Sequence, residues 1–124
     1  MRALVVDDSK AIRRILGQML ESLRFEVQEA SNGKEALTIV TGEKPFEVAL
    51  VDWNMPEMNG YELLCEIRKD SGYDNMRIMM VTTETEMSQV VKALEAGANE
   101  YVMKPFTKEM ILEKLNLMGL AVST

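Results

Sequence analysis

Short apolar runs alternate along the chain with segments in which apolar residues recur every three or four positions. The runs at residues 3–6, 48–51 and 78–81 are continuously apolar, which is typical of parallel strands covered on both faces. Residues 25–28 alternate between apolar and polar, as expected for a strand nearer the edge of a sheet, and residues 101–103 form a shorter candidate. The pattern therefore predicts five strands.

The segments between these runs predict amphipathic helices. The clearest apolar stripe consists of Ile12, Ile15, Leu16, Met19, Leu20 and Leu23. Shorter stripes lie within residues 36–40, 63–67, 87–94 and 110–118. Asn32 and Asn59 each stand three residues before a glutamate, which predicts a capping box, and Ser9 and Thr107 are candidate N-caps. Gly97 fits the end of the fourth helix.

The order of the predicted elements is strand then helix, five times over. Such repetition predicts an α/β fold, in which a parallel sheet has helices on both faces. Right-handed crossovers and five strands favour the flavodoxin-like, doubly wound order 2-1-3-4-5 with five helices. No linker or low-complexity stretch divides the chain, so we expect residues 1–124 to form a single domain.

Polar side chains follow four of the predicted strands. Asp7 and Asp8 follow the first strand, Asp52 the third, Thr82 the fourth and Lys104 the fifth. In open α/β sheets, ligands bind beyond the carboxyl ends of the strands, at the switch between the first and third strands of this order. We therefore expect the three carboxylates to lie close together.

The composition limits the chemistry available to these residues. The 124-residue chain has 20 acidic and 14 basic side chains, a formal net charge of −6, and no histidine. The acidic balance argues against nucleic-acid binding. Without histidine there is no Ser-His-Asp triad, no imidazole ligand and no phosphohistidine on this chain. The chemistry must therefore use carboxylates, hydroxyls and lysines.

Three neighbouring carboxylates repel one another, so at least one pKa rises unless a cation binds. Oxygen ligands without histidine or cysteine favour a hard cation, most simply Mg²⁺. A carboxylate can also act as a nucleophile and form an aspartyl phosphate, with Mg²⁺, Lys104 and the Thr82 hydroxyl balancing the phosphoryl charge. Plainer interpretations stay open for single residues: an acidic pair can stabilise a helix N-terminus, and Asp52 can be an N-cap.

Four motifs together resemble one known family. They are the segments LVVDDS at residues 4–9, VDWNMPEMNG at 51–60, VT at 81–82 and YVMKPF at 101–106. The chain is similar in these motifs to the receiver domains of bacterial two-component response regulators, and most closely to their single-domain, CheY-like chemotaxis members. The resemblance covers nearly the whole chain.

The resemblance implies that Asp52 is the phosphoacceptor and that a sensor histidine kinase is the phosphodonor. It implies a Mg²⁺ site in which Asp8 binds the ion directly and Asp7 partly through water. Asp52 and the backbone carbonyl of Asn54 complete the ligand set.

The family also implies roles for residues farther along the chain. Thr82 is expected to be the switch hydroxyl, Tyr101 an aromatic rotamer switch, and Lys104 a phosphoryl contact positioned by a cis peptide bond to Pro105. Asn54 and Glu84 match residues that influence the hydrolysis rate of the acyl phosphate.

A downstream protein, whose identity is unknown, is expected to bind the face formed by the fourth helix, fifth strand and fifth helix. We expect this face to include Val90, Val91, Tyr101, Met103, Phe106 and Lys114. Members that bind the flagellar motor tend to carry lysines at the start of the fourth helix, whereas residues 84–87 have none, so motor binding is in doubt. We expect neither nucleic acid nor membrane as a partner, and a monomer or weak dimer.

Other functions fit the residues less well. A phosphatase of the haloacid dehalogenase type needs an acidic residue where this chain has Asn54. We therefore expect that the chain is not an enzyme and catalyses only its own phosphotransfer and dephosphorylation. A flavin phosphate would be repelled by Asp7 and Asp8. A receiver fragment of a longer regulator and an unphosphorylated adaptor remain alternatives to a stand-alone regulator. The single cysteine, Cys65, favours a cytoplasmic location.

Overall fold

The computed structural model describes residues 1–42, 44–83 and 87–120 of the chain. The five strands are β1 (Arg2–Val6), β2 (Glu26–Ala30), β3 (Val48–Asp52), β4 (Arg77–Thr82) and β5 (Glu100–Met103). The helices are α1 (Lys10–Ser22), α2 (Gly33–Gly42), α3 (Gly60–Arg68), α4 (Met87–Glu95) and α5 (Lys108–Leu117), with a short 3-10 helix, η1, at Ser71–Tyr73.

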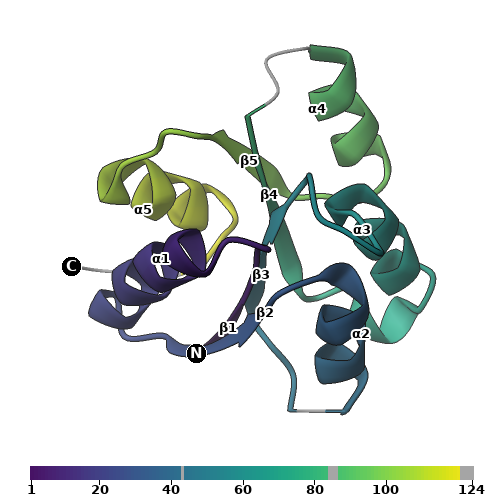
Figure 1. Cartoon of the computed structure of the whole chain (residues 1–124), viewed down its shortest axis with the longest axis horizontal. Coiled ribbons are helices and arrows are strands. Elements are labelled where there is room, and N and C mark those ends of the chain that lie inside the picture. The colour runs from purple at the N-terminus through teal and green to yellow at the C-terminus, as the bar shows by residue number, and fades with distance from the viewer. Residues whose placement is uncertain (43, 84–86, 121–124) are drawn as a thin grey trace.

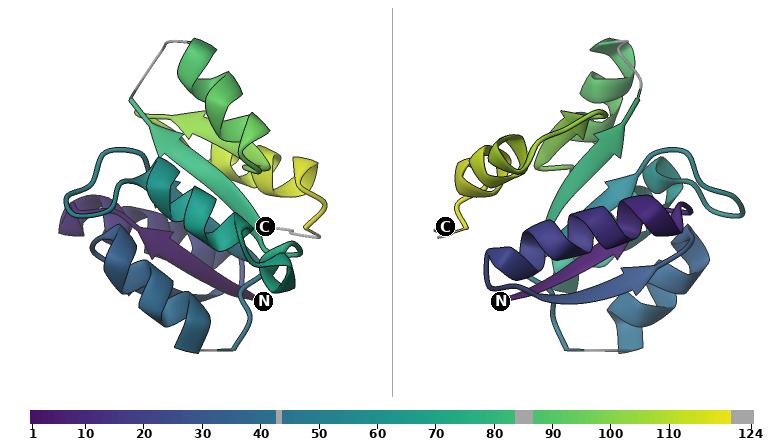
Figure 2. Two further views of the ribbon diagram at one scale, coloured as in Figure 1. Left: turned by 90° about the vertical axis from the view of Figure 1, so that its right-hand side faces the viewer. Right: turned by 60° about the vertical axis from the view of Figure 1, so that its left-hand side comes forward.

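The strands form one parallel sheet in the order β2-β1-β3-β4-β5, which confirms the predicted topology. Helices α1 and α5 cover one face, and α2, α3 and α4 cover the other (Figure 1; Figure 2). Because β1 and β3 are neighbours, their carboxyl ends meet at the same edge of the sheet. The elements that carry the candidate residues are therefore side by side.

The continuous apolar runs occupy the centre of the sheet. Every residue of β3 is buried, as are residues 3–6 of β1, because both strands have helices on both faces. Separate apolar cores fill the two faces: Leu16 and Leu115 lie in the core beneath α1 and α5, and Leu63 in the core beneath α2, α3 and α4.

The strand predicted at residues 25–28 begins and ends later, at 26–30. Phe25 is buried, but its N–H bonds to the carbonyl oxygen of Leu20 at 3.0 Å and closes the end of α1. Arg24 has a φ of 73°, which turns the chain out of the helix immediately before β2. Phe25 therefore belongs to the helix terminus rather than to the strand.

Side-chain caps define most of the helix starts as predicted. Ser9, Asn59 and Thr107 each accept a hydrogen bond from the backbone N–H three residues later, and Asn59 forms a full capping box with Glu62. At α2 the predicted box differs, because Glu35 bonds to the N–H of the residue before Asn32. No helix in the described part of the chain is long and apolar enough to span a membrane.

Candidate functional site

Three carboxylates lie together at the edge where β1 and β3 end. Asp7 directly follows β1, and Asp52 is the last residue of β3. Asp7, Asp8 and Asp52 each offer a carboxylate oxygen within 4.8 Å of the others. Asp7 and Asp52 are only 1% and 5% exposed, whereas Asp8 is exposed. The structure thus brings together the cluster that the sequence predicted.

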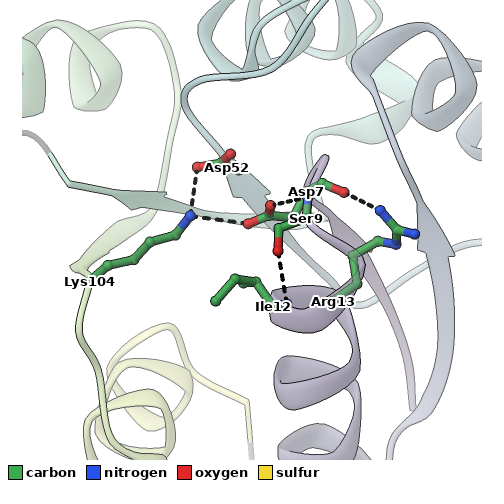
Figure 3. Close-up of polar contacts among 6 residues, drawn as sticks. All are labelled: Asp7, Ser9, Ile12, Arg13, Asp52 and Lys104. Carbon is green, nitrogen blue, oxygen red and sulfur yellow. Dashed lines mark hydrogen bonds and ion pairs between the residues drawn. The ribbon is translucent and has the colours of Figure 1, made fainter.

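Lys104 reaches this cluster from the loop after β5 (Figure 3). Its Nζ lies 3.2 Å from Asp7 Oδ2 and 3.2 Å from Asp52 Oδ1, so one ammonium bridges the two buried carboxylates. Its backbone N–H bonds to the carbonyl oxygen of Thr82 at 2.8 Å. The peptide bond to Pro105 is cis, as the resemblance implied.

The positive charge of Lys104 does not fully compensate the cost of ionising Asp52. Burial raises the pKa of Asp52, repulsion from Asp7 raises it further, and Lys104 only partly offsets both effects. Burial alone lowers the pKa of Lys104, but attraction to Asp52 and Asp7 outweighs burial and leaves this pKa raised. Lys104 is therefore firmly charged, and Asp52 retains an uncompensated cost of ionisation.

Ser9 and Arg13 hold Asp7 in place, and the contact with Arg13 was not predicted from the sequence. The N–H of Ser9 donates to Asp7 Oδ1 at 2.8 Å. Arg13 on α1 donates from Nη1 to the backbone carbonyl of Asp7 at 2.6 Å (Figure 3). Its Nε donates to Glu29 Oε1 at 3.1 Å. Arg13 is a positioning residue. It lies on a helix whose pattern indicates only amphipathicity, so this contact could not be predicted from the sequence.

Gly60, at the start of α3, sets the position of Asp52 from the opposite side. Its N–H bonds to the carbonyl oxygen of Trp53 at 2.9 Å. A Cβ added at Gly60 would lie 2.2 Å from the carbonyl oxygen of Asp52, which is closer than atoms in contact can approach. The sequence indicated a helix start at this Asn-Gly pair but not that the helix packs directly against the acceptor strand.

The other residues predicted for the site differ in burial and in the element that carries them. Thr82 is buried at the end of β4, the strand next to β3. Tyr101 is half-buried on β5, with Lys114 Nζ 4.7 Å from the centre of its ring. Asn54 is exposed in the loop that follows β3. Glu84 lies outside the described residues.

The predicted docking face needs one correction. Val91 and Met103 are exposed, at 43% and 38%, as such a face requires. Val90 is buried instead, because it lies on the side of α4 that faces the sheet. Phe106 is partly buried and packs against the core beneath α1 and α5.

The donor set fits a hard divalent cation. The cluster offers only carboxylate oxygens from Asp7, Asp8 and Asp52, and two of these side chains are nearly inaccessible to water. Mg²⁺ binds through one or two carboxylates while keeping several waters. The exposed side of the cluster, at Asp8, leaves room for those waters. Binding would relieve the repulsion that raises the pKa of Asp52.

Comparison with known proteins gives a consistent result. A family model described as the response regulator receiver domain matches residues 3–116. A chemotaxis protein CheY homologue of Campylobacter jejuni is 47% identical over 116 residues, covering 93% of this chain and 89% of that protein. The chemotaxis protein CheY1 of Helicobacter pylori is 44% identical over 119 residues, with 95% and 96% covered.

Solved structures agree with this similarity. The chemotaxis response regulator CheY4 of Vibrio cholerae superposes with a TM-score of 0.87 at 35% sequence identity, covering 94% of this chain and 97% of that one. A CheY-like receiver domain protein from Methanospirillum hungatei gives a TM-score of 0.84 at 37% identity, with 93% and 90% covered.

Replacing Asp52 by Asn tests the charge imbalance. Because the pKa of Asp52 is raised on folding, its ionisation destabilises the native state as pH rises from the unfolded pKa through the folded one. Without added metal, we expect Asp52→Asn to raise the free energy of unfolding at pH 7 by on the order of 1 kcal/mol. The gain should shrink as the pH is lowered through the raised pKa of folded Asp52, because the wild-type carboxyl is then protonated and neutral like the asparagine. Urea denaturation across this range measures it, and a destabilised variant at pH 7 would contradict the imbalance.

Replacing Gly60 by Ala tests the packing of α3 against Asp52. The added methyl group must displace the carbonyl oxygen of Asp52 or the start of the helix. We expect a loss of stability of about 2 kcal/mol or more, as for other overpacked sites. Gly42→Ala is the matched control, because a Cβ there has no neighbour within 4 Å. Equal stabilities of the two variants in urea denaturation would contradict the close packing.

Proposed function

Because this chain belongs to the response regulator receiver domain family, we propose that Asp52 accepts a phosphoryl group and thereby switches a two-component signalling pathway. The position of Asp52 carries the proposal. Its carboxylate is buried at the end of β3, lies within 4.8 Å of the carboxylates of Asp7 and Asp8, and has an ammonium 3.2 Å away. This combination provides a nucleophile, a cation site and a fixed positive charge.

In the proposed reaction, a carboxylate oxygen of Asp52 attacks the phosphorus of a phosphohistidine. A P–O bond forms while the P–N bond breaks, and its electron pair stays on the imidazole nitrogen, which takes up a proton. The chain has no histidine, so the phosphohistidine belongs to another protein, a sensor histidine kinase. The product on this chain is an acyl phosphate at Asp52.

The surrounding residues position and neutralise the transferred group. Lys104, already within 3.2 Å of Asp52, binds a phosphoryl oxygen, and the Thr82 hydroxyl donates to another. When bound at the three carboxylates and the Asn54 carbonyl, Mg²⁺ supplies charge neutralisation at the phosphoryl oxygens.

Hydrolysis reverses the modification: a P–O bond to water forms, the P–O bond to Asp52 breaks, and inorganic phosphate leaves while Asp52 becomes a carboxylate again. Asn54 and Glu84 influence the rate of this step in the proposal. Asn54 has no acidic group to protonate a foreign leaving group, so the chain catalyses only its own phosphotransfer and dephosphorylation.

The phosphorylated state is read by a protein partner at the face formed by α4, β5 and α5. Exposed apolar side chains support this location: Val91 and Leu94 on α4 and Met103 on β5 are all more than a third exposed. The relatives named above are chemotaxis proteins, which supports a regulator of the CheY-like kind. We expect it to act in the cytoplasm, where a lone thiol such as Cys65 stays reduced.

Incubation with acetyl phosphate and Mg²⁺, followed by intact mass measurement, tests the proposal. We expect the wild type to gain one phosphoryl group and Asp52→Asn to gain none. Asp8→Asn is the matched control, because it keeps the acceptor but removes an exposed oxygen of the cation cluster. Its phosphorylation should be slower by about tenfold or more, since losing a metal contact weakens binding on this scale.

Chelation of Mg²⁺ by EDTA should suppress phosphorylation of the wild type in the same assay. No mass gain in the wild type, or an equal gain in Asp52→Asn, would rule out Asp52 as the acceptor.

A further inference from the structure

Asp7 and Asp8 differ in how firmly the fold holds them. Every polar atom of Asp7 is bonded: its N–H donates to the carbonyl oxygen of Ala30 at 3.2 Å, and its three oxygens accept the hydrogen bonds described above. Asp8 is exposed, and within the described ranges no hydrogen bond or ion pair holds its carboxylate. The orientation of the Asp8 side chain therefore depends on the backbone on either side of it.

The peptide unit between Asp7 and Asp8 is held from α1. Arg13 Nη1 donates to the carbonyl oxygen of this peptide, which belongs to Asp7, at 2.6 Å (Figure 3). Because a peptide unit is planar, fixing its carbonyl oxygen also fixes the direction in which the Asp8 backbone begins. Ser9, the residue after Asp8, is the N-cap of α1. The backbone of Asp8 is thus held on both sides, although its carboxylate is not.

Glu29 on β2 holds Arg13 in turn. Its Oε1 accepts a hydrogen bond from Arg13 Nε at 3.1 Å, in an ion pair whose side chains are 15% exposed for Arg13 and 43% for Glu29. The guanidinium group presents its donors in a rigid plane, so an acceptor at Nε also fixes the direction of Nη1. A side chain on a neighbouring strand therefore sets how Arg13 meets the peptide before Asp8.

The stability of α1 alone does not explain an arginine at this position. Arg13 is the fourth residue of α1, and the first turn of this helix contains no acidic residue. A cation near the N-terminus of a helix is unfavourable, because it opposes the helix dipole. The contacts with Asp7 and Glu29 supply the reason that helix stability does not.

We propose that Glu29 is a positioning residue of the cation site: through Arg13 it fixes the peptide between Asp7 and Asp8, and so keeps the Asp8 carboxylate directed toward the other two. This inference rests on the proposed function, which assigns Mg²⁺ to the three carboxylates. Glu29 and Arg13 are not part of that cluster and act through the backbone. Residues that orient metal ligands in this way commonly change metal affinity by about 10- to 100-fold.

An effect of charge alone predicts a different result. Arg13 is a cation bonded to the backbone of the site, so its removal would by itself reduce the repulsion of Mg²⁺ and strengthen binding. Loss of positioning weakens binding instead. The two explanations therefore predict opposite changes for Arg13→Gln.

Titration of the full chain with Mg²⁺, followed by tryptophan fluorescence, measures the affinity, because Trp53 is the only tryptophan and directly follows Asp52. We expect Arg13→Gln to raise the Kd for Mg²⁺ by about tenfold. Glu29→Gln should raise it by about threefold, since the bond from Arg13 to the backbone remains. The double variant should bind no more weakly than Arg13→Gln, whereas independent effects would multiply to about thirtyfold.

Two further variants control for charge. Arg14→Gln removes the same charge from the next residue of α1, which is exposed, and should leave the Kd within about twofold of the wild type. Arg13→Lys keeps the charge, but a single ammonium does not reproduce the planar fork, so the Kd should rise by about threefold or more. Urea denaturation at increasing Mg²⁺ gives a second measure of each Kd and shows that each variant is folded.

The inference is overturned if Arg13→Gln leaves the Kd unchanged or lowers it. It is also overturned if Arg13→Gln and Glu29→Gln act independently in the double variant, or if Arg14→Gln weakens binding as much as Arg13→Gln. These outcomes leave the proposed function intact. If the wild type binds no Mg²⁺ by either measurement, the cation site of the proposed function fails, and the inference fails with it.

Discussion

One ammonium shared between two buried carboxylates is the constraint on which the site depends. Lys104 lies 3.2 Å from both Asp7 and Asp52, yet the pKa of Asp52 remains raised. Buried charges are stable only when they are well paired. This arrangement therefore favours the binding of a further cation. Three features hold the carboxylates in this unfavourable proximity: the pairing of β1 with β3, the N–H of Ser9 that donates to Asp7, and the contact from Arg13.

The same constraint links the carboxylates to the far side of the sheet. Lys104 is hydrogen-bonded through its backbone to Thr82, and Thr82 ends the strand that pairs with β5. Tyr101 on β5 lines a small cavity together with Thr82, and the Lys114 ammonium lies 4.7 Å from the centre of its ring. In the proposed function, these contacts connect a change of charge at Asp52 to the strands next to α4.

Most of the fold could be predicted because burial on both faces leaves continuous apolar runs, as at residues 48–51. The carboxylate cluster could be predicted because parallel strands deliver their carboxyl ends to one edge. Contacts between residues far apart in the sequence could not be predicted. Arg13 contacts Asp7 from a helix face whose pattern indicates only a polar surface. Gly60 packs against Asp52 at a position where the sequence indicates only the start of a helix. Val90 was misplaced because the apolar stripe of α4 is wide enough to leave its orientation ambiguous.

Excess negative charge around Asp52 favours the binding of a cation. The most direct measurement is urea denaturation of the wild type and of Asp8→Asn with increasing Mg²⁺. We predict that Mg²⁺ raises the free energy of unfolding of the wild type by about 2.7 kcal/mol at a hundredfold excess over Kd. At the same Mg²⁺ concentration, the free energy of unfolding of Asp8→Asn should rise far less. Equal responses of the two proteins, or no response of the wild type, would contradict it.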